Sequence, residues 1–367
     1  RRAPKANGCA RSWRRRGAIK ATPIDRAMAF CVRGADERLP GAVRAACASR
    51  LSICDPPLFF RAPMLPSELH TKWDRRFFVI RAAGAIAVDT ADRKPSTPPP
   101  PKYNLTRALL LAEASYCTAT EDQPLLPAEL RKTIIVTKVV DNHATRAVIG
   151  WDASDRSLFV SFRGTENDRN WWQDAKFVKI RPYADYKDVA VERGFWRWYN
   201  FLKEDVAHQL TKAKAKFDPA TLFTPVRFYG HSAGGAVAVL AAFDQLRGNV
   251  YNSTKLKGSY TFGCPRVGSS AFAKAFTSLL GDAENWRVTH RDDVVPHLPQ
   301  EDLGYLHTPR EAYQRDEVKP DLIYCDDSAS HEDDACSNSC YPLGCTSVVD
   351  HLSYLGLVQG IGGCVEL

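Results

Sequence analysis

Beyond residue 102, the chain alternates between short apolar runs and longer segments in which apolar residues recur with the period of a helix. The runs typical of β-strands cover residues 133–141, 146–152, 157–164, 225–230, 258–264 and 285–290. The segments typical of helices cover residues 106–117, 194–217, 233–247 and 269–280. Apolar strands that alternate with helices are typical of a sheet with helices on both faces. The pattern therefore predicts an α/β fold with a central, mostly parallel sheet.

Residues 1–60 have no sustained helix or strand period, and the charge of the first 102 residues differs from that of the rest. They contain 21 Lys and Arg against 8 Asp and Glu, a net +13, whereas residues 103–367 contain 29 against 34, a net −5. Residues 92–102, DRKPSTPPPPK, have the composition of a stiff, extended linker. We therefore predict a basic, proline-rich and disordered N-terminal extension over residues 1–102, followed by one domain over residues 103–367.

Four features of the sequence bear on where the protein works and on its partners. Residues 64–87 resemble a secretory signal, with basic residues, the apolar run FFVIRAAGAIA and small residues at the end, although Arg81 interrupts the run. The chain has 11 cysteines, which favours disulfides and an oxidising compartment. The basic extension has no interleaved aromatic residues, which argues against a nucleic-acid partner. No apolar run reaches the roughly 18 residues typical of a transmembrane helix. We expect a secreted protein without a transmembrane segment.

The clearest chemical motif is Gly-His-Ser-Ala-Gly-Gly at residues 230–235. It follows the apolar strand 225–230 and precedes the apolar helix 233–247. A serine on a sharp turn between a strand and a helix is typical of a nucleophile elbow, where glycines avoid collisions with neighbouring chain segments. The first amides of the helix then point to where negative charge develops, which makes the N–H of Ala233 a candidate oxyanion donor. The alternative is that Ser232 only caps this helix.

A serine hydroxyl needs a general base, and the base needs an acid that orients it. In α/β hydrolases the order along the chain is serine, acid, histidine, so both partners are expected after Ser232. Asp292 and Asp293 follow the strand 285–290 at its carboxyl end, where a catalytic acid is expected. The histidines beyond Ser232 are His290, His297, His307, His331 and His351. Spacing alone does not choose between these aspartates or among these histidines.

Eight sequence motifs, the one at residues 230–235 among them, occur in order along residues 103–367. They are SYC (115–117), FRGT (162–165), RNWWQD (169–174), GHSAGG (230–235), TFGCPRVG (261–268), VTHRDDVVPHLP (288–299), GYLHTPREAY (304–313) and TSVVDHLSYLG (346–356). Together they resemble the secreted class 3 lipases of filamentous fungi. The resemblance implies an α/β-hydrolase fold and a triacylglycerol lipase, a serine esterase that cleaves carboxylic esters through an acyl-enzyme and needs no metal ion or other cofactor.

The resemblance also implies roles for single residues. Ser232 corresponds to the nucleophile, Asp293 to the triad acid and His351 to the general base. Thr165 and Ala233 correspond to the two oxyanion-hole donors.

Other polar residues of the same motifs are expected to be structural. Asp292 is then a loop residue, and His231 and His307 are buried hydrogen-bonding residues. Arg163 and Arg266 are expected to brace loops through ion pairs.

The resemblance and the cysteine positions together predict a disulfide framework. Its members are Cys117 with Cys364 and Cys325 with Cys336, both as in the family, and Cys340 with Cys345, which rests on closeness in sequence rather than on the family. Cys264, where the family usually has glutamine, is then a buried free thiol.

Residues 166–180, ENDRNWWQDAKFVKI, predict a short amphipathic helix with Trp171, Ala175 and Val178 on one face. In this position the segment resembles a lipase lid, whose apolar face covers the active site in water and contacts lipid at an interface. The lid candidates are Trp171, Trp172 and Phe177.

The predicted lid favours lipid esters at an oil–water or membrane interface as substrates, because related feruloyl esterases carry a more polar segment here. A feruloyl or other carbohydrate esterase and a phospholipase A1 remain alternatives on the same fold. A more distant alternative is an inactive protein that binds lipid or a surface. We expect a monomer, and the sequence does not determine acyl chain length or positional preference.

Overall fold

The computed structural model describes residues 102–120, 123–124, 126–142, 145–165, 176–248, 250–316, 321–325, 332–341 and 344–365. The predicted N-terminal extension, its signal-like segment 64–87 and nearly all of the proline-rich linker lie outside these residues. Trp171 and Trp172, two of the lid candidates, also lie outside them.

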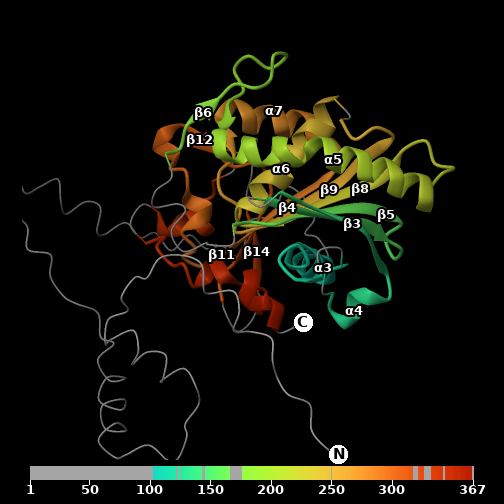
Figure 1. Ribbon diagram of the computed structural model, residues 1–367. Helices are drawn as coiled ribbons and strands as arrows, with labels where there is room; N and C mark the ends of the chain where they lie inside the picture. The colour runs from blue at the N-terminus through green and yellow to red at the C-terminus, as the bar shows by residue number, and fades with distance from the viewer. Residues whose placement is uncertain are drawn as a thin grey trace, which may run out of the picture. The chain divides into compact units, whose positions relative to one another are not determined.

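An eight-stranded sheet forms the centre of the domain (Figure 1). In spatial order its strands are β14 (Leu322–Tyr324), β13 (Glu311–Gln314), β11 (Glu284–His290), β9 (Thr254–Phe262), β8 (Thr224–His231), β5 (Ser157–Phe162), β4 (Thr145–Asp152) and β3 (Ile134–Asn142). The strands from β13 to β5 run parallel, and antiparallel pairs flank them at both edges. This arrangement confirms the predicted central, mostly parallel sheet.

The strands β13 and β14 do not follow from the apolar pattern. β13 reads Glu-Ala-Tyr-Gln, yet all four residues are buried. Glu311 is tolerated there because it accepts hydrogen bonds from Arg287 Nη2 at 3.0 Å and from Thr289 Oγ1 at 2.5 Å, both on β11. Buried polar groups with partners of this kind leave no hydrophobic signature in the sequence.

Helices cover both faces of the sheet, as predicted. α5 (Arg193–Phe217), α6 (Ala233–Gly248) and α7 (Ser270–Leu280) lie on one face, and α3 (Lys102–Glu113) and α4 (Ala128–Arg131) lie on the other (Figure 1). α6 is buried over most of its length because its sequence is apolar on all sides. α5 is amphipathic and buries one stripe, made of Phe195, Tyr199, Leu202, Val206, Leu210 and Ala213. None of the described helices is long and apolar enough to cross a membrane.

α3 ends at Glu113, four residues before the predicted end of this helix. Ala114–Tyr116 form a turn, in which the Ser115 amide donates to the Ala112 carbonyl and the Tyr116 amide donates to the Glu113 carbonyl. The turn carries the Tyr116 ring into the interior, where it is 6% exposed. Hydrogen bonds of this ring with distant segments determine where the helix stops, and they are described below.

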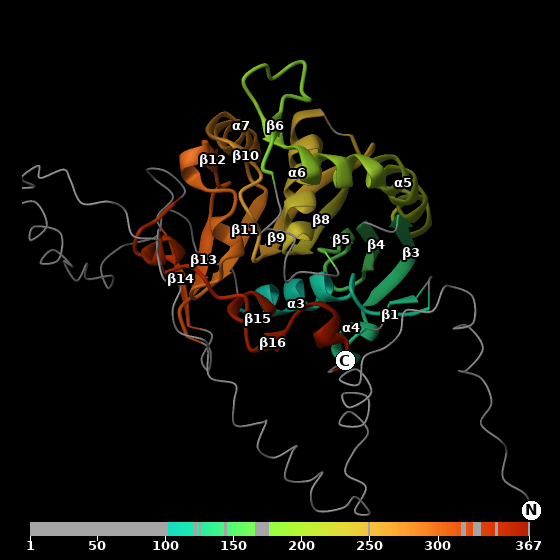
Figure 2. The same cartoon turned by 60° about the vertical axis from the view of Figure 1, so that its left-hand side comes forward.

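The remaining strands are short. β6 (Lys179–Ile180), β7 (Val191–Glu192), β10 (Gly268–Ser269) and β12 (Tyr305–Leu306) form a four-stranded sheet, which appears next to α7 in Figure 2. β1 (Thr118–Thr120) pairs with β2 (Gln123–Pro124), and β15 (Ser353–Tyr354) pairs with β16 (Leu357–Val358). β15 and β16 lie on the same side of the central sheet as α3 (Figure 2).

The predicted helix 166–180 is wrong at its C-terminal end. Residues 176–178 are irregular, and Lys179–Ile180 form β6, which pairs antiparallel with β7. Backbone pairing with β7 therefore overrides the helical spacing of the apolar residues at this end. The part of the segment over residues 166–175 lies outside the described residues.

The structure contains the three disulfides named from the sequence: Cys117–Cys364, Cys325–Cys336 and Cys340–Cys345. The first joins the end of α3 to the 3₁₀ helix η6 (Gly360–Val365). Cys264 is a buried free thiol, as predicted, and burial raises its pKa to about 12. A thiol with this pKa stays protonated and unreactive at neutral pH.

Candidate active site

Ser232 lies on the turn between β8 and α6, with no exposed surface. Its φ of 56° places a non-glycine residue in the left-handed region, which costs free energy and marks functional turns. The turn is held on both sides, because the Ser232 amide donates to the Phe262 carbonyl of β9 and the Gly235 amide donates to the Ser232 carbonyl, both at 2.9 Å. The strained serine between a parallel strand and a helix has the geometry of a nucleophile elbow.

Glycine is required next to this serine by close backbone packing. A Cβ on Gly234 would lie 2.2 Å from the Phe162 carbonyl oxygen, and one on Gly230 would lie 2.3 Å from the Gly234 carbonyl oxygen. Both distances are far below van der Waals contact, so a side chain on Gly234 would push α6 away from β5, and one on Gly230 would push α6 away from β8. The two glycines thereby let the start of α6 pack closely against both strands beside Ser232.

The segment after β5 lies against the elbow. A Cβ on Gly164 would be 3.1 Å from the Ser232 Cβ, which places the Gly164–Thr165 backbone beside the serine. On the other side, Ala233 is buried at the first turn of α6, where the helix amides are not used within the helix. The structure thus brings both sequence-predicted oxyanion donors next to Ser232.

Asp292 and Asp293 follow β11, but their surroundings differ. Asp292 is exposed, and its amide donates to Asp350 Oδ2 at 3.3 Å. Asp293 is 1% exposed, and its Oδ2 accepts a hydrogen bond from His351 Nδ1 at 2.8 Å. Only the second aspartate therefore contacts a histidine that lies near Ser232.

His351 lies on the 3₁₀ helix η5 (Asp350–Leu352), close to the elbow. A Cβ on Gly263, which directly follows β9, would lie 2.8 Å from His351 Nδ1. The ring also stacks on that of His231, the residue before Ser232, with 4.6 Å between ring centroids. The Ser232 hydroxyl is buried and has no hydrogen-bond partner among the described residues.

Two further hydrogen bonds hold Asp293. Its Oδ1 accepts from the Val295 amide at 2.8 Å, and its Oδ2 accepts from the Tyr354 hydroxyl. Burial alone would raise the pKa of Asp293, but the charge of His351 and the hydrogen bonds from His351, Tyr354 and Val295 lower it below the usual value. Asp293 is therefore an ionised acceptor fixed in position beside His351.

Sequence reasoning missed Tyr354 as a member of this site. The tyrosine is fully buried on β15, and burial followed by the Asp293 charge raises its pKa well above the usual value, so it stays a donor. The motif Asp-His-Leu-Ser-Tyr places it three residues after His351, and this spacing is the signal that was present in the sequence.

Three other histidines have structural partners, and His331 lies outside the described residues. His307 is buried and donates from Nε2 to the Pro296 carbonyl at 2.8 Å, as its predicted structural role requires. His290 donates from Nδ1 to the Asp350 carbonyl at 3.0 Å. His231 is fully buried between Tyr116 and His351, which confirms the predicted hydrogen-bonding role.

Arg266 braces the loop that follows Asp293, also as predicted. Its guanidinium is fully buried and pairs with Glu332 through two contacts of 2.9 and 3.1 Å. A third nitrogen, Nη1, donates to the His297 carbonyl at 2.8 Å and to the Pro299 carbonyl at 3.2 Å. Arg163 is buried at the end of β5, and its ion pair stays a prediction.

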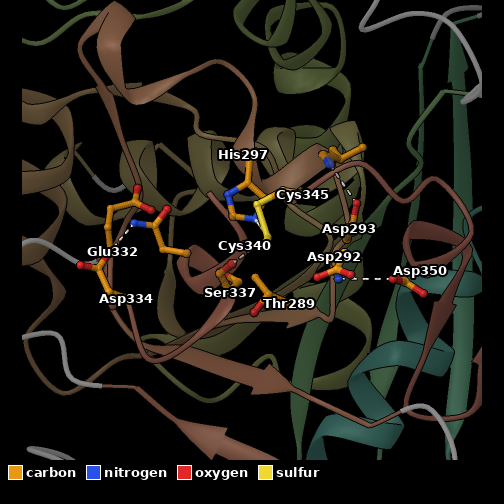
Figure 3. The surroundings of a disulfide bond; sticks show 12 residues. Thr289, Asp292, Asp293, His297, Glu332, Asp334, Ser337, Cys340, Cys345 and Asp350 are labelled. Carbon is orange, nitrogen blue, oxygen red and sulfur yellow. Dashed lines mark hydrogen bonds between the residues drawn. A yellow bond between two sulfur atoms is a disulfide. The ribbon is translucent and has the colours of Figure 1, made fainter. Parts of the chain in front are cut away.

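A disulfide lies beside the same loop (Figure 3). Cys340 Sγ is 3.7 Å from His297 Nε2. Its disulfide partner Cys345 precedes a segment whose backbone pairs with that around Asp293. In that segment the Ser347 amide donates to the Asp292 carbonyl at 2.9 Å, and the Ser347 carbonyl accepts from the Val294 amide at 3.2 Å. Backbone pairing thus joins the loop that contains Asp293 and follows β11, called the acid loop below, to the segment that leads to His351.

Three groups of described side chains are close enough together to be tested as metal ligands. They are His297 with Cys340 and Cys345, Glu113 with Cys117 and Cys364, and Glu311 with Cys325 and Cys336. Each group contains both cysteines of a disulfide, and a disulfide sulfur is not the thiolate that binds metal ions. None of the three groups therefore fits a metal centre in the oxidised protein.

An apolar cluster lies next to Asp293. It consists of Val294, Val295 and Leu298, and the half-buried side chains of Phe177 and Val348 pack against it. Phe177 is the described member of the predicted lid, so the end of the lid segment contacts the acid loop. The residues that follow these two side chains, Val178 and Val349, are 37% and 74% exposed.

Comparison with known proteins identifies the family. The sequence model described as Lipase (class 3) matches residues 159–303. The chain is 29% identical to the lipase of Rhizomucor miehei over 94% of each protein. It is 38% identical to the secreted mono- and diacylglycerol lipase A of Penicillium cyclopium, over 44% of this chain and 50% of that relative. A solved triacylglycerol lipase, whose catalytic centre is described as a serine protease triad, is 30% identical with a TM-score of 0.61, over 71% of this chain and 96% of that one.

The chain belongs to the class 3 lipases. The resemblance stated from the sequence motifs is therefore confirmed, and with it the α/β-hydrolase fold. As a member of this family the lipase is a serine hydrolase of carboxylic esters. The proposal below assigns this chemistry to residues of the elbow, to the buried Asp293–His351 pair and to the neighbouring backbone amides.

Proposed function

We propose that this lipase hydrolyses acylglycerols with Ser232 as nucleophile, His351 as general base and Asp293 as triad acid. The hydrogen bond of 2.8 Å between His351 and Asp293, beside the strained turn of Ser232, carries this proposal. The aspartate is buried and ionised, so it fixes the imidazole and favours its protonated form during the reaction. Asp292, which is exposed, has no such role.

In the proposed reaction His351 takes the proton of the Ser232 hydroxyl as the oxygen attacks the ester carbonyl. The oxyanion that forms is held by the amides of Thr165 and Ala233, which are positioned before the reaction begins. His351 then protonates the leaving alcohol, and the acyl group remains on Ser232. Water attacks this acyl-enzyme with the same base, and the fatty acid leaves. No step uses a metal ion or an organic cofactor.

Acylglycerols are favoured over feruloyl sugars by the surface beside Asp293 and by the relatives. Val178 and Val349 expose apolar surface next to the cluster of Val294, Val295 and Leu298, as expected for contact with lipid. Relatives in Rhizomucor and Penicillium are named as a lipase and as a mono- and diacylglycerol lipase. In the same proposal, Trp171, Trp172 and Phe177 belong to a lid that opens at a lipid interface.

The name of the Penicillium relative describes it as secreted, and the three disulfides suit an oxidising compartment. We therefore include secretion in the proposal, with residues 103–367 as the catalytic domain of a monomer.

Initial rates decide the substrate class. The purified protein is assayed on triacylglycerols of different chain length, below and above their solubility limit, beside methyl ferulate and phosphatidylcholine. We expect a rise in rate where the triacylglycerol forms a separate phase, and no turnover by Ser232→Ala on any ester. Faster hydrolysis of methyl ferulate or of phosphatidylcholine would overturn the choice of substrate, and retained turnover by Ser232→Ala would overturn the mechanism.

A further inference from the structure

One chain of hydrogen bonds runs behind the proposed active site, through two buried side chains. Gly164 N–H donates to the Tyr116 hydroxyl oxygen at 3.0 Å, and this hydroxyl lies 3.1 Å from His231 Nδ1. At the other side of the imidazole, His231 Nε2 lies 2.9 Å from the carbonyl oxygen of His351. These hydrogen bonds thus link Gly164, which precedes the proposed oxyanion donor Thr165, through His231 to the proposed general base His351.

The direction of each hydrogen bond follows from the chemistry of the partners. A carbonyl oxygen only accepts, so His231 Nε2 carries a proton and donates to His351. If the imidazole is neutral, Nδ1 then has no proton and accepts from the Tyr116 hydroxyl. Burial, followed by the charge of His351, lowers the pKa of His231 to about 3, so the ring is neutral at any pH where the enzyme would work. The Tyr116 hydroxyl therefore accepts from Gly164 and donates to His231 Nδ1, and His231 Nε2 donates to the His351 carbonyl.

Both ends of this series of hydrogen bonds contact backbone segments that must be placed accurately for catalysis. A Cβ on Gly164 would lie 2.3 Å from the Tyr116 hydroxyl oxygen, so this phenol contacts the backbone immediately before Thr165. The His351 ring stacks on the His231 ring with 4.6 Å between centroids, in addition to the hydrogen bond at its carbonyl. Tyr116 also precedes Cys117, which the disulfide with Cys364 ties to the C-terminal segment.

We propose that Tyr116 and His231 are positioning residues, which jointly set the oxyanion donor of Thr165 and the base His351 at the correct distance from Ser232. Tyr116 acts through Gly164 on the donor, and His231 acts through the His351 backbone on the base. This inference rests on the proposed triad.

Three variants test the proposal in the full-length protein. Tyr116→Phe removes only the hydroxyl, His231→Gln keeps an N–H donor near the position of Nε2, and His231→Leu keeps volume without a donor. Misplacement of reacting groups by about 1 Å costs on the order of 100-fold in rate. We therefore expect kcat on a soluble p-nitrophenyl ester to fall 10- to 100-fold in Tyr116→Phe with little change in KM, and to be partly restored in His231→Gln relative to His231→Leu.

The matched control is Tyr251→Phe. Tyr251 is a buried tyrosine that precedes β9, at the opposite end of this strand from Phe262 and Ser232, and its hydroxyl donates to Tyr199 at 3.3 Å. The Tyr251→Phe substitution should lower the melting temperature about as much as Tyr116→Phe does, while kcat stays at the wild-type value. A second readout is the affinity for a boronic acid, which forms a tetrahedral adduct with serine. This affinity should fall in Tyr116→Phe in parallel with kcat.

A Tyr116→Phe protein with wild-type kcat and boronate affinity would overturn the proposal, as would equal kcat in His231→Gln and His231→Leu. If Tyr116→Phe does not fold, the comparison of the two His231 variants decides. A wild-type protein that forms no boronate adduct would instead contradict the proposed nucleophile, so the two failures are distinguishable.

Discussion

Ser232 lies where a parallel strand meets a helix, whereas Asp293 and His351 lie on loops and 3₁₀ turns that follow the sheet. The elbow is held by backbone contacts, such as the approach of Gly234 to the Phe162 carbonyl, which any substitution that adds a Cβ would disturb. The acid and base are held by side-chain hydrogen bonds, an ion pair of Arg266 and a disulfide. Changes in the first region are therefore expected to affect folding, and changes in the second to affect catalysis.

The largest difference should appear between the two neighbouring aspartates. Asp293→Asn keeps the shape of the side chain but removes the charge that orients His351, so we expect kcat to fall roughly 10⁴-fold. Asp292→Asn, at an exposed residue, should leave kcat near the wild-type value. The measurement is kcat on a soluble ester for both variants, with circular dichroism to verify folding. Similar losses in both variants would show that the 2.8 Å contact of Asp293 is not what matters.

The pH dependence of stability should depend strongly on His231, which lies between the two regions. Its pKa is about 3 in the folded protein against 6.5 for an unperturbed histidine. Between these pH values the unfolded chain binds more protons, so the free energy of unfolding falls as pH is lowered from 6.5 towards 3. The shift corresponds to roughly 5 kcal/mol of stability at neutral pH. His231→Gln should flatten this part of the curve, measured by urea unfolding at several pH values.

The control for this titration is His208→Gln, at an exposed position on α5. It should leave the slope of stability against pH at the wild-type value. If His231→Gln and wild type lose stability equally between pH 6.5 and 3, His231 is not neutral in the folded protein.

The packing of the elbow predicts a smaller effect, on stability. Gly234→Ala places a methyl group 2.2 Å from a backbone oxygen of β5, and such overpacking costs up to about 3 kcal/mol. Gly248→Ala, at the other end of α6, adds its methyl where no atom lies within 4 Å and should be neutral or stabilising. Guanidinium unfolding of both variants checks the difference. Equal stability would contradict the close approach of α6 and β5.

The smallest effect is expected from the disulfide beside the acid loop. Cys340→Ser with Cys345→Ser opens a loop closed over a separation of 5 residues, which costs about 2 kcal/mol of stability. Because the following segment pairs with Asp292 and Val294, kcat should also fall several-fold. Cys325→Ser with Cys336→Ser, a separation of 11, should cost about 3 kcal/mol but leave kcat unchanged. A loss of kcat in the Cys325→Ser and Cys336→Ser variant alone would contradict the conclusion that the Cys340–Cys345 disulfide supports the acid loop.

Much of the first region could be predicted from the sequence. Apolar runs identified the strands around Ser232, and the glycines of the motif at residues 230–235 indicated the turn, because both signals are local. The acid and base could not be chosen by spacing, because Asp293 and His351 meet only through the fold. The family motifs supplied the choice, and the contact of 2.8 Å agrees with it.

Several contacts between distant buried polar groups were not predicted. Tyr116 was expected inside a helix, yet its ring leaves that helix to reach Gly164 and His231. Tyr354 donates to Asp293 from a two-residue strand that has no apolar period. The end of the predicted lid helix was wrong because β6 pairs with β7 there. In each case a long-range hydrogen bond outweighs the local pattern.

Labelling with a serine-reactive organophosphonate, followed by peptide mass spectrometry, tests the central claim most directly. A triad made of Ser232, His351 and Asp293 predicts one phosphonate per protein, on Ser232, formed quickly in the wild type. It predicts much slower labelling in Asp293→Asn and none in Ser232→Ala. A phosphonate on another residue, or a wild-type protein that takes up none while folded, would contradict the account.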